Sequence, residues 1–549
     1  MGKIFAKAST VITWLGVEDT NSQLAFAVMR QLEPIVPLWE VERGKGFNYA
    51  YNDRALFRKA GVPMVKDEEW GALLSFFERH YFHRCKIVQE ISLARGAVLM
   101  CGNHFEDWGR LIDVSKFLLE STWIPMLEVV GKPSSVGPFW PTLAVPAIFS
   151  DIGTWCTRLH TDSVFESEAA RSKIQANEAY SFLEALLQKT RYFDATDPRD
   201  AIFAMLSIAS HVCESKIPEI LFMKPNYFVP AQNVFVHISR EILINTRRIS
   251  LLSMVDRDQC ETPGLPSWVP DFNAFSPAMA LNFLSTGSHK LYNAFEDTPN
   301  SLHLSITDKV MHLNGILLDT ITEIETRDRS HSPNSWVKMC LNLPGTYVNG
   351  KSRVDALWRT TIADQNGTKS PAPTTLGFAF RQYILMTSVE LVLDEIEKFG
   401  NVGGVRTEIL HECSGYDELA QDQPDDEFHL FPTRQNIVEF TTSLFAFRRA
   451  GAEEQINSME QKAHVYMALL SAIKGKRKLF RTKNNLLGLG PGSMSAGDSV
   501  WFFPTSNTPF VLRCVEASTH ELVGEAYLHG YMHGEIKEQG LTLQRVSIC

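Results

Sequence analysis

The chain of 549 residues has no uncharged apolar run that reaches the roughly 20 residues needed to cross a bilayer. Its first residues also lack the charged, apolar and small-residue regions of a cleaved signal peptide. These two absences predict a soluble protein with no membrane span.

Closely spaced cysteines and an excess of positive charge are also missing. The nine cysteines are scattered without the spacing of a disulfide framework, which predicts reduced thiols. The formal net charge of -10 disfavours nonspecific attraction to nucleic acid or to anionic lipid. We therefore expect an intracellular, cytoplasmic protein that has no nucleic-acid partner.

Motifs of enzyme chemistry are scarce. No G-x-S-x-G elbow is present, and the scattered cysteines and histidines define no nucleophilic triad. The glycines of Gly488–Gly492 suggest a phosphate loop, but Pro491 and the missing Lys-Ser/Thr pair favour a turn. His529 and His533 stand beside Glu535 without the H-E-x-x-H order of a zinc-binding helix. The sequence therefore predicts no catalytic residue, no cofactor-binding residue and no cofactor.

A second set of possible zinc ligands lies between residues 80 and 104. Its members are His80, His83, Cys85, Cys101 and His104. They do not form a tight four-ligand cluster, and we expect His104 to begin a helix. No metal site is assigned.

The densest structural signal lies between Trp70 and Gly102. Apolar residues recur at helical spacing over 70–77 and again over 87–94, which predicts two helices. The second helix contains the polar pair Gln89-Glu90, which either faces solvent or contacts a buried partner. Gly96 is expected to end this helix, and 97–101 reads as a short buried strand.

The start of the chain resembles the inside of an α/β domain. Residues 1–8 have helical spacing without a capping residue ahead of them, and 11–16 reads as a strand that ends at Gly16. In a doubly wound domain, further strands would precede this helix. We therefore expect an incomplete α/β unit here.

Further helices are predicted over 53–60, 106–120, 163–190, 435–449 and 453–474. After Arg481 the apolar period changes from about 3.6 to 2, and 500–503, 510–514 and 520–524 read as short strands of a small barrel or curled sheet. The expected fold class is α+β.

Several stretches, in sequence order, resemble those of fungal heterokaryon incompatibility (HET) domain proteins. Met1–Gly16 resembles "M-x-x-I-Y-x-x-A-x-x-V-x-x-W-L-G", and Phe82–Ala94 is similar to "F-x-R-x-W-x-x-Q-E-I-x-L-A". Ala195–Asp200 resembles "A-x-D-P-R-D", Leu265–Asp271 resembles "L-P-S-W-x-P-D", and shorter matches continue from Leu487 to Gly530. The residues that carry these motifs are Trp14, Gly16, Arg84, Gln89, Glu90, Asp197, Pro198, Arg199, Asp200, Trp268, Asp271, Gly497, Asp498, Arg513, Gly524, Glu525 and Gly530.

The resemblance implies a role in fungal non-self recognition and programmed cell death. It implies four regions: the C-terminal part of a HET domain (1–105), a mainly helical region (106–300), a mixed region with mobile loops and helices (301–480) and a small β-rich unit (481–549). The implied partners are proteins of the incompatibility system, and the oligomeric state is left open by the sequence.

Two departures from the family pattern weigh against enzyme activity. The stretches "L-S-Y-x-W-G" and "W-I-D-x-x-C-I-N-Q" of the N-terminal half of the HET domain have no counterpart, and Lys86 replaces the usual Trp. The HET domain is thought to be related to the TIR fold, some members of which cleave NAD. Glu18 and Asp19, after the first strand, are the best carboxylates for such chemistry, although a solvated loop is the favoured interpretation.

The non-enzymatic reading is thus preferred, with action by protein interaction. The alternatives are a TIR-like NAD-hydrolysing or nucleotide-binding effector, and an inactive truncated paralogue. Structural roles are expected for the motif residues. Asp197 is predicted to cap a helix that begins at Pro198, Trp268 to anchor an extended segment over 265–271, and Glu90 to stabilise the α/β unit.

Overall fold

A computed structural model gives the structure of the chain. It describes residues 2–44, 51–121, 168–214, 223–274, 291–295, 301–326, 334–367, 369–399, 415–422, 430–451, 469–516 and 518–549, together with isolated positions between these ranges.

The chain divides into two compact units. The N-terminal unit comprises Met1–Thr246, Glu261–Gly264 and Asp271–Pro277, and the C-terminal unit comprises Arg247–Cys260, Leu265–Pro270 and Ala278–Cys549. Each unit is described by itself.

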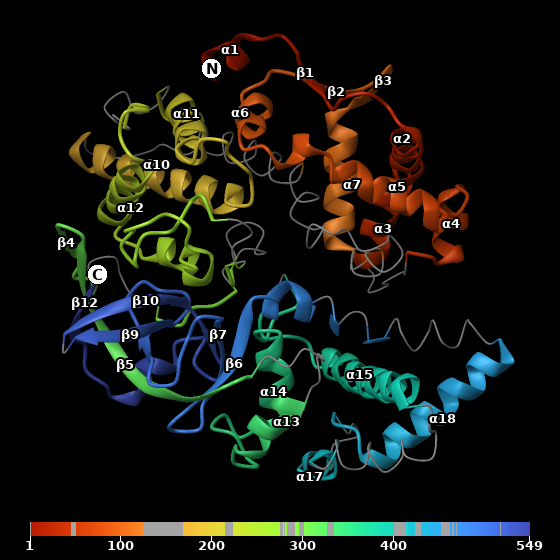
Figure 1. Ribbon diagram of the computed structural model, residues 1–549. Coiled ribbons are helices and arrows are strands. Elements are labelled where there is room, and N and C mark those ends of the chain that lie inside the picture. Colours follow the sequence, from red (N-terminus) through yellow and green to blue (C-terminus); the bar gives the residue numbers. More distant parts are fainter. Residues whose placement is uncertain are drawn as a thin grey trace. The chain divides into compact units, whose positions relative to one another are not determined.

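The N-terminal unit contains a three-stranded sheet in the order β1-β2-β3 (Figure 1). Strand β1 (Val11–Trp14) pairs in parallel with β2 (Ala97–Cys101), and β2 pairs antiparallel with β3 (His104–Asp107). The predicted strands at 11–16 and 97–101 are confirmed. A parallel pair requires a crossover connection, and residues 20–92 provide it with a series of helices.

Several helices of this unit were predicted, whereas α2, α3 and α12 were not. Helix α4 begins after Asp53, whose carboxylate accepts the Ala55 backbone N–H (2.7 Å), and ends at Gly61 with φ +71°. The α-helices described in this unit are α1 (Gly2–Lys7), α2 (Thr20–Leu32), α3 (Ile35–Gly44), α4 (Arg54–Ala60), α5 (Asp67–Phe77), α6 (Lys86–Ser92), α7 (Trp108–Glu120), α10 (Glu168–Thr190), α11 (Asp200–Glu214) and α12 (Ala231–Thr246).

Two local predictions near the sheet are wrong. His104 begins strand β3 instead of a helix, because the chain reverses at Gly102 (φ +54°) and returns along β2. Helix α7 starts only after Asp107, whose carboxylate accepts the Gly109 backbone N–H. Gly96 does not end the preceding helix either, since α6 stops at Ser92 and Leu93 takes the capping position.

The C-terminal unit is built on a strand-rich structure around the long strand β5 (Val310–Ile324) (Figure 1). In succession, β5 pairs with β12 (Gln544–Ile548), β8 (Ser499–Phe502) and β6 (Arg477–Thr482). The circuit closes because β8 pairs with β9 (Phe510–Glu516), β9 with β10 (Thr519–Glu525), and β10 with β12. This arrangement confirms the α+β class and the barrel-like C-terminal region.

Strand β7 (Leu487–Pro491) replaces the turn predicted for Gly488–Gly492. It pairs with β6 and with β11 (Tyr527–Leu528), and all five of its residues are buried. A Cβ atom at Gly488 would overlap the ring of Phe480 on β6. The glycines therefore make room for an aromatic ring on the neighbouring strand instead of forming a phosphate loop.

The remaining elements of this unit are mostly helical. They are η2 (Ser250–Met254), η3 (Arg257–Gln259), β4 (Ser305–Thr307), α13 (Asn334–Leu341), α14 (Arg353–Thr361), α15 (Thr375–Phe399), α17 (Tyr416–Gln421), α18 (Arg434–Ala450) and η5 (Glu535–Gln539). The helix predicted over 453–474 lies for the most part outside the described residues. Among the helices that the structure describes, none is long and apolar enough to cross a membrane.

Candidate functional site

Two motif segments that are more than 100 residues apart in the sequence meet in the N-terminal unit. The backbone N–H of Cys85 donates to the carbonyl of Asp194 (2.9 Å), and the N–H of Asp194 donates to the carbonyl of His83 (2.5 Å). The Lys86 ammonium lies 2.9 Å from the Asp200 carboxylate, and this contact raises the pKa of Lys86. Lys86, which replaces the usual Trp of the family pattern, thus links the motif over 82–94 to the motif over 195–200.

The Asp197-Pro-Arg-Asp200 segment forms a turn ahead of α11. Asp197 accepts the backbone N–H of Arg199 (3.0 Å) and two guanidinium hydrogen bonds from it (2.8 and 2.7 Å). These bonds lower the pKa of Asp197. The helix begins at Asp200, two residues later than predicted, because Asp197 stabilises this turn before the first helical residue.

Arg199 extends this network to the loop over 223–229. Its Nη1 atom donates to the carbonyl of Val229 (3.0 Å) and also to that of Tyr227. The Tyr227 hydroxyl donates to Asp200 (2.6 Å), and burial followed by this bond raises the pKa of Tyr227 to about 12. Arg199 and Asp200 therefore hold the two residues that flank Phe228.

The tip of this loop presents an aromatic side chain to solvent. Phe228 is 99% exposed, while Asn226 accepts its backbone N–H (2.9 Å) in a tight turn. Sequence reasoning did not identify Tyr227 or Phe228. The signal that was available is an aromatic pair between Pro225 and Pro230.

Gln89 and Glu90 lie on α6, which belongs to the motif over 82–94. Gln89 is buried. Glu90 is half-buried and accepts a hydrogen bond from the Tyr81 hydroxyl (3.3 Å), which also contacts Thr13 on β1 (3.4 Å). Burial raises the pKa of Glu90, and the bond from Tyr81 together with the nearby Arg84 offsets part of that rise. Glu90 is thus linked to β1 through the Tyr81 hydroxyl.

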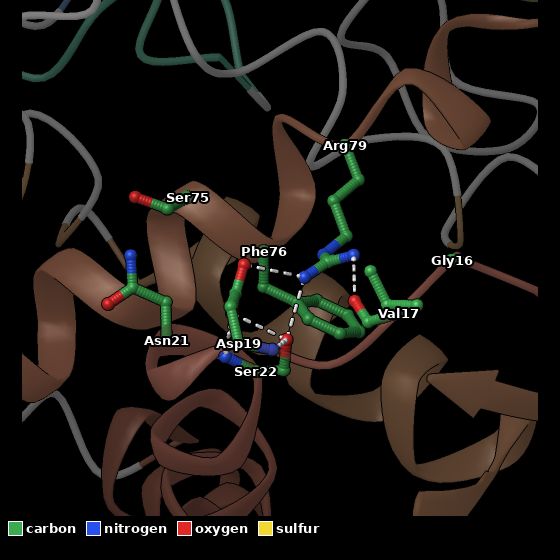
Figure 2. A pocket seen from close by; sticks show the side chains of 8 residues that line it. All are labelled: Gly16, Val17, Asp19, Asn21, Ser22, Ser75, Phe76 and Arg79. Atoms are coloured by element: carbon green, nitrogen blue, oxygen red, sulfur yellow. Dashed lines mark hydrogen bonds and ion pairs between the residues drawn. The ribbon is translucent and has the colours of Figure 1, made fainter. Parts of the chain in front are cut away.

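A pocket of about 420 Å³ lies at the carboxyl end of β1 (Figure 2). Its lining consists of Gly16, Val17, Asp19, Asn21, Ser22, Ser75, Phe76 and Arg79. Gly16 has φ +98°, which turns the chain from β1 toward α2. The exposed side chain of Trp14 precedes this turn.

The charged groups of the pocket bind one another. Asp19 accepts the backbone N–H of Ser22 (2.7 Å) and caps α2, and the hydroxyl of Ser22 lowers the pKa of Asp19. Arg79 donates to Asp19 (2.9 Å), to Ser22 (2.7 Å) and to the Leu15 carbonyl (3.0 Å). The segment after Gly16 is a solvent-exposed loop, as favoured, and its Asp19 also caps α2. The guanidinium of Arg79 is bound by oxygens of the protein.

Glu18, the other candidate carboxylate, is not part of the pocket lining. Its Oε2 lies 3.1 Å from Nε2 of His104 on β3. The structure therefore does not bring Glu18 and Asp19 together on one ligand position. In the part of the chain that is described, no three His, Cys, Asp or Glu side chains form a group that fits a metal ion.

The motif over 265–271 contributes Trp268 to the C-terminal unit and Asp271 to the N-terminal unit. Trp268 is fully buried and donates to the Lys309 carbonyl (2.8 Å). The segment around it turns instead of extending, since the Val269 N–H donates to the Pro266 carbonyl (3.0 Å). Asp271, in the N-terminal unit, accepts the backbone N–H of Thr262 (2.7 Å).

The C-terminal motifs contain two ion pairs, of which one is buried, and tight turns. Asp498 accepts two hydrogen bonds from Arg513 (3.0 and 2.8 Å), directly after Gly497 at φ +97°. The Glu525 carboxylate lies 2.8 Å from the guanidinium of Arg477, and both side chains are almost fully buried.

Two further glycines of these motifs have backbones that side chains rarely adopt. Gly524 has φ +152° and Gly530 has φ +83°. A Cβ atom at Gly524 would lie 2.8 Å from Cγ of Pro491. The motifs of the barrel therefore support its shape.

Two comparisons with known proteins found similarities. Residues 448–542 match the family model of the Het-6 beta-barrel domain, and this match includes β8, β9 and β10 of the closed strand circuit but not β5 or β12. The chain is also similar to "Heterokaryon incompatibility protein 6, OR allele" of Neurospora crassa, with 22% identity over 599 residues that cover 98% of this chain and 78% of that protein. No solved structure matches the chain. The two matches support a fungal protein of the heterokaryon incompatibility type.

Proposed function

We propose that this protein acts in non-self recognition and programmed cell death signalling in the fungal cytoplasm, by binding a protein partner. The observation that carries the proposal is the network of Lys86, Asp200 and Arg199, which fixes a loop with Phe228 at its tip. Residues of two family motifs thus serve to present a single aromatic side chain.

The chemistry of this loop suits recognition of a protein. Aromatic side chains provide much of the binding energy at protein interfaces, and a side chain that is held in place before binding loses less entropy. Phe228 is 99% exposed, whereas its neighbours Tyr227 and Val229 are tied to Arg199 through their carbonyls. We expect the partner to offer an apolar pocket that accepts one phenyl ring.

In this proposal the motif residues hold the loop in place and do not catalyse a reaction. The carboxylates of Asp197 and Asp200 are engaged by Arg199, Lys86 and Tyr227. The pocket near Gly16 has Asp19 and Arg79 bound to each other. Neither place offers a carboxylate directed at a substrate.

The test is expression of the chain in a filamentous fungus of a different incompatibility type, with growth arrest as the readout. Phe228→Ala should abolish the arrest, because loss of an interface anchor costs about 2 kcal/mol or more of binding energy. Val348→Ala, at another exposed apolar residue (58% exposed), is the matched control and should retain the arrest. Equal protein levels and melting temperatures are required for all three chains.

Two results would count against the proposal. One is growth arrest by Phe228→Ala that equals that of the unchanged chain. The other is the absence of any arrest with the unchanged chain across fungal strains of differing type.

A further inference from the structure

Arg381 on α15 is a half-buried cation that has no carboxylate beside it among the described residues. Within that part of the chain its guanidinium makes one hydrogen bond, from Nη2 to the Oδ1 atom of Asn436 on α18 (3.1 Å). Six other arginines of the C-terminal unit lie 3.0 Å or less from an aspartate or glutamate oxygen of that unit, namely Arg353, Arg359, Arg434, Arg477, Arg481 and Arg513. Arg381 differs from them because its partner is a neutral amide.

The position of the Arg381 guanidinium is set by contacts within the unit. Helices α15 and α18 pack against each other (Figure 1). The Oδ1 atom of Asn436 also accepts the backbone N–H of Thr433 (3.1 Å), and the N–H of Asn436 donates to the Thr433 hydroxyl (3.1 Å). This reciprocal pair caps α18, so the acceptor that holds Arg381 is itself held in place.

Arg381 retains the capacity to bind an anion. A guanidinium has five N–H donors, and Asn436 accepts from one of them. Burial lowers the pKa of Arg381, and no charged neighbour offsets this effect. A cation that is removed from water costs free energy unless an anion or hydrogen-bond acceptors compensate it. An incoming carboxylate would supply that compensation.

The charged residues around the start of α18 are bound to other side chains. Arg434 pairs with Asp417, and Glu439 accepts a hydrogen bond from Gln435 (2.9 Å). Arg434 is therefore not available as a second cation for the same ligand. One guanidinium matches the single charge of a carboxylate, whereas a phosphate group carries up to two negative charges.

An exposed aromatic side chain lies next to Arg381. Phe378 is 40% exposed and precedes Arg381 by three residues on α15, so the two side chains are neighbours on the helix surface. We propose that this place binds a segment of a protein partner. A glutamate or aspartate carboxylate of that segment pairs with Arg381, and an adjacent apolar side chain packs on Phe378. The planar guanidinium can give a carboxylate two parallel hydrogen bonds, which makes the contact specific.

This inference does not depend on the proposed role of Phe228. Phe228 and its loop belong to the N-terminal unit, whereas α15 and α18 belong to the C-terminal unit. Failure of either proposal therefore leaves the other in place.

Binding of short capped peptides to the full chain tests the site. Each labelled heptapeptide carries one Glu and one Leu, separated by none to three residues in a Gly/Ser background, and fluorescence anisotropy gives the dissociation constant. For at least one spacing, replacing Glu by Gln in the peptide should raise the dissociation constant by at least about tenfold, because hydrogen bonds to a charged group are lost.

Variants of the chain assign this preference to the site. Arg381→Gln should remove the preference for Glu over Gln, and Phe378→Ala should weaken the Glu and Gln peptides alike. Arg545→Gln is the matched control, since Arg545 also has no carboxylate partner among the described residues but is exposed on β12. It should keep the preference.

Melting temperatures separate a binding role from a structural one. Arg381→Gln removes a cation that has no anion, so its melting temperature should equal or exceed that of the unchanged chain. Arg359→Gln leaves Asp355 and Asp364 without their cation and should lower it. A lower melting temperature of Arg381→Gln together with an unchanged peptide preference would show a structural role and overturn the inference.

Three other results would overturn it as well. The first is that no peptide spacing prefers Glu over Gln. The second is that Arg545→Gln removes the preference as Arg381→Gln does, because the peptides would then respond only to net charge. The third is displacement of the peptide by inorganic phosphate but not by sodium acetate of equal ionic strength, because the site would then take phosphate.

Discussion

The two sheets of this protein treat their edges in opposite ways. In the C-terminal unit, β5 pairs with β8 and β12, and the circuit of strands closes. In the N-terminal unit, β1 pairs only with β2 among the described strands. Closure satisfies backbone groups within the molecule, whereas an open edge leaves them available for another chain. Among the described residues, the barrel strands therefore satisfy their backbone groups within the circuit, whereas β1 is paired along one edge.

Two ion pairs that contain motif residues, one in each unit, differ in burial. The side chains of Arg477 and Glu525 are 5% and 3% exposed, but those of Arg199 and Asp197 are 22% and 29% exposed. A buried ion pair responds strongly to the loss of either partner, while a pair near the surface contributes little to stability. We therefore expect the Arg477–Glu525 pair to matter more for stability than the Arg199–Asp197 pair.

The largest expected effect is in the barrel. Glu525→Ala removes the carboxylate beside the buried Arg477 guanidinium and should lower the free energy of unfolding by about 3–5 kcal/mol. Glu323→Ala is the control, since the side chains of Glu323 and Arg481 are 31% and 21% exposed, and it should cost at most about 1 kcal/mol. Differential scanning calorimetry measures both. Equal effects of the two variants would contradict the contrast between the buried and the exposed pair.

The next effect is acid sensitivity of the barrel through His529. Burial lowers the pKa of His529 to about 3, from its usual 6.5. Between pH 6.5 and pH 3 the unfolded chain binds a proton that the folded chain does not, so stability should fall with decreasing pH. The loss is about 1.4 kcal/mol for each pH unit in this window.

His529→Gln removes this titration. Chemical unfolding between pH 7 and pH 5 should therefore show a shallower loss of stability in the variant than in the unchanged chain. Identical slopes in the two chains would show that His529 is not neutral in the folded barrel.

A smaller effect of opposite sign is expected in the N-terminal unit. Burial raises the pKa of Glu90 above 4.5, so the folded state holds a proton that the unfolded state has already released. Stability should fall as pH rises from 4.5 through the raised pKa, and Glu90→Gln should remove this step. Glu90→Ala, which also loses the Tyr81 hydrogen bond, should lower the melting temperature. A stable Glu90→Ala protein that loses its biological response would contradict the structural role of Glu90.

Local sequence signals predicted several helices, including α4, α5 and α7, and the late strands, but they did not predict α2, α12, α14 or α15. Asp53 and Gly61 cap the two ends of α4, as predicted. The alternation of apolar and polar residues after 499 corresponds to β8, β9 and β10. The signals failed where the answer depends on distant residues. Strand β5 is paired with β12, more than 200 residues later, and no local pattern encodes that partner.

The candidate site was predicted in part for the same reason. The motif residues Asp197, Arg199 and Asp200 were identified from the sequence, but their contact with the loop at Tyr227 and Phe228 was not. The network depends on two segments that meet only in the folded chain. A lone aromatic pair between two prolines does not reveal which residues will fix it.

The most direct test of action by interaction, as opposed to chemistry, is to incubate the purified chain with NAD and follow nicotinamide release. Cleavage of a glycosidic bond generally needs a carboxylate directed at the sugar. Here Asp19 caps α2 and binds Arg79, while Glu18 contacts His104. We expect no release above that of a heat-denatured control. Release that disappears with Glu18→Gln or Asp19→Asn would contradict the interaction proposal and assign chemistry to the end of β1.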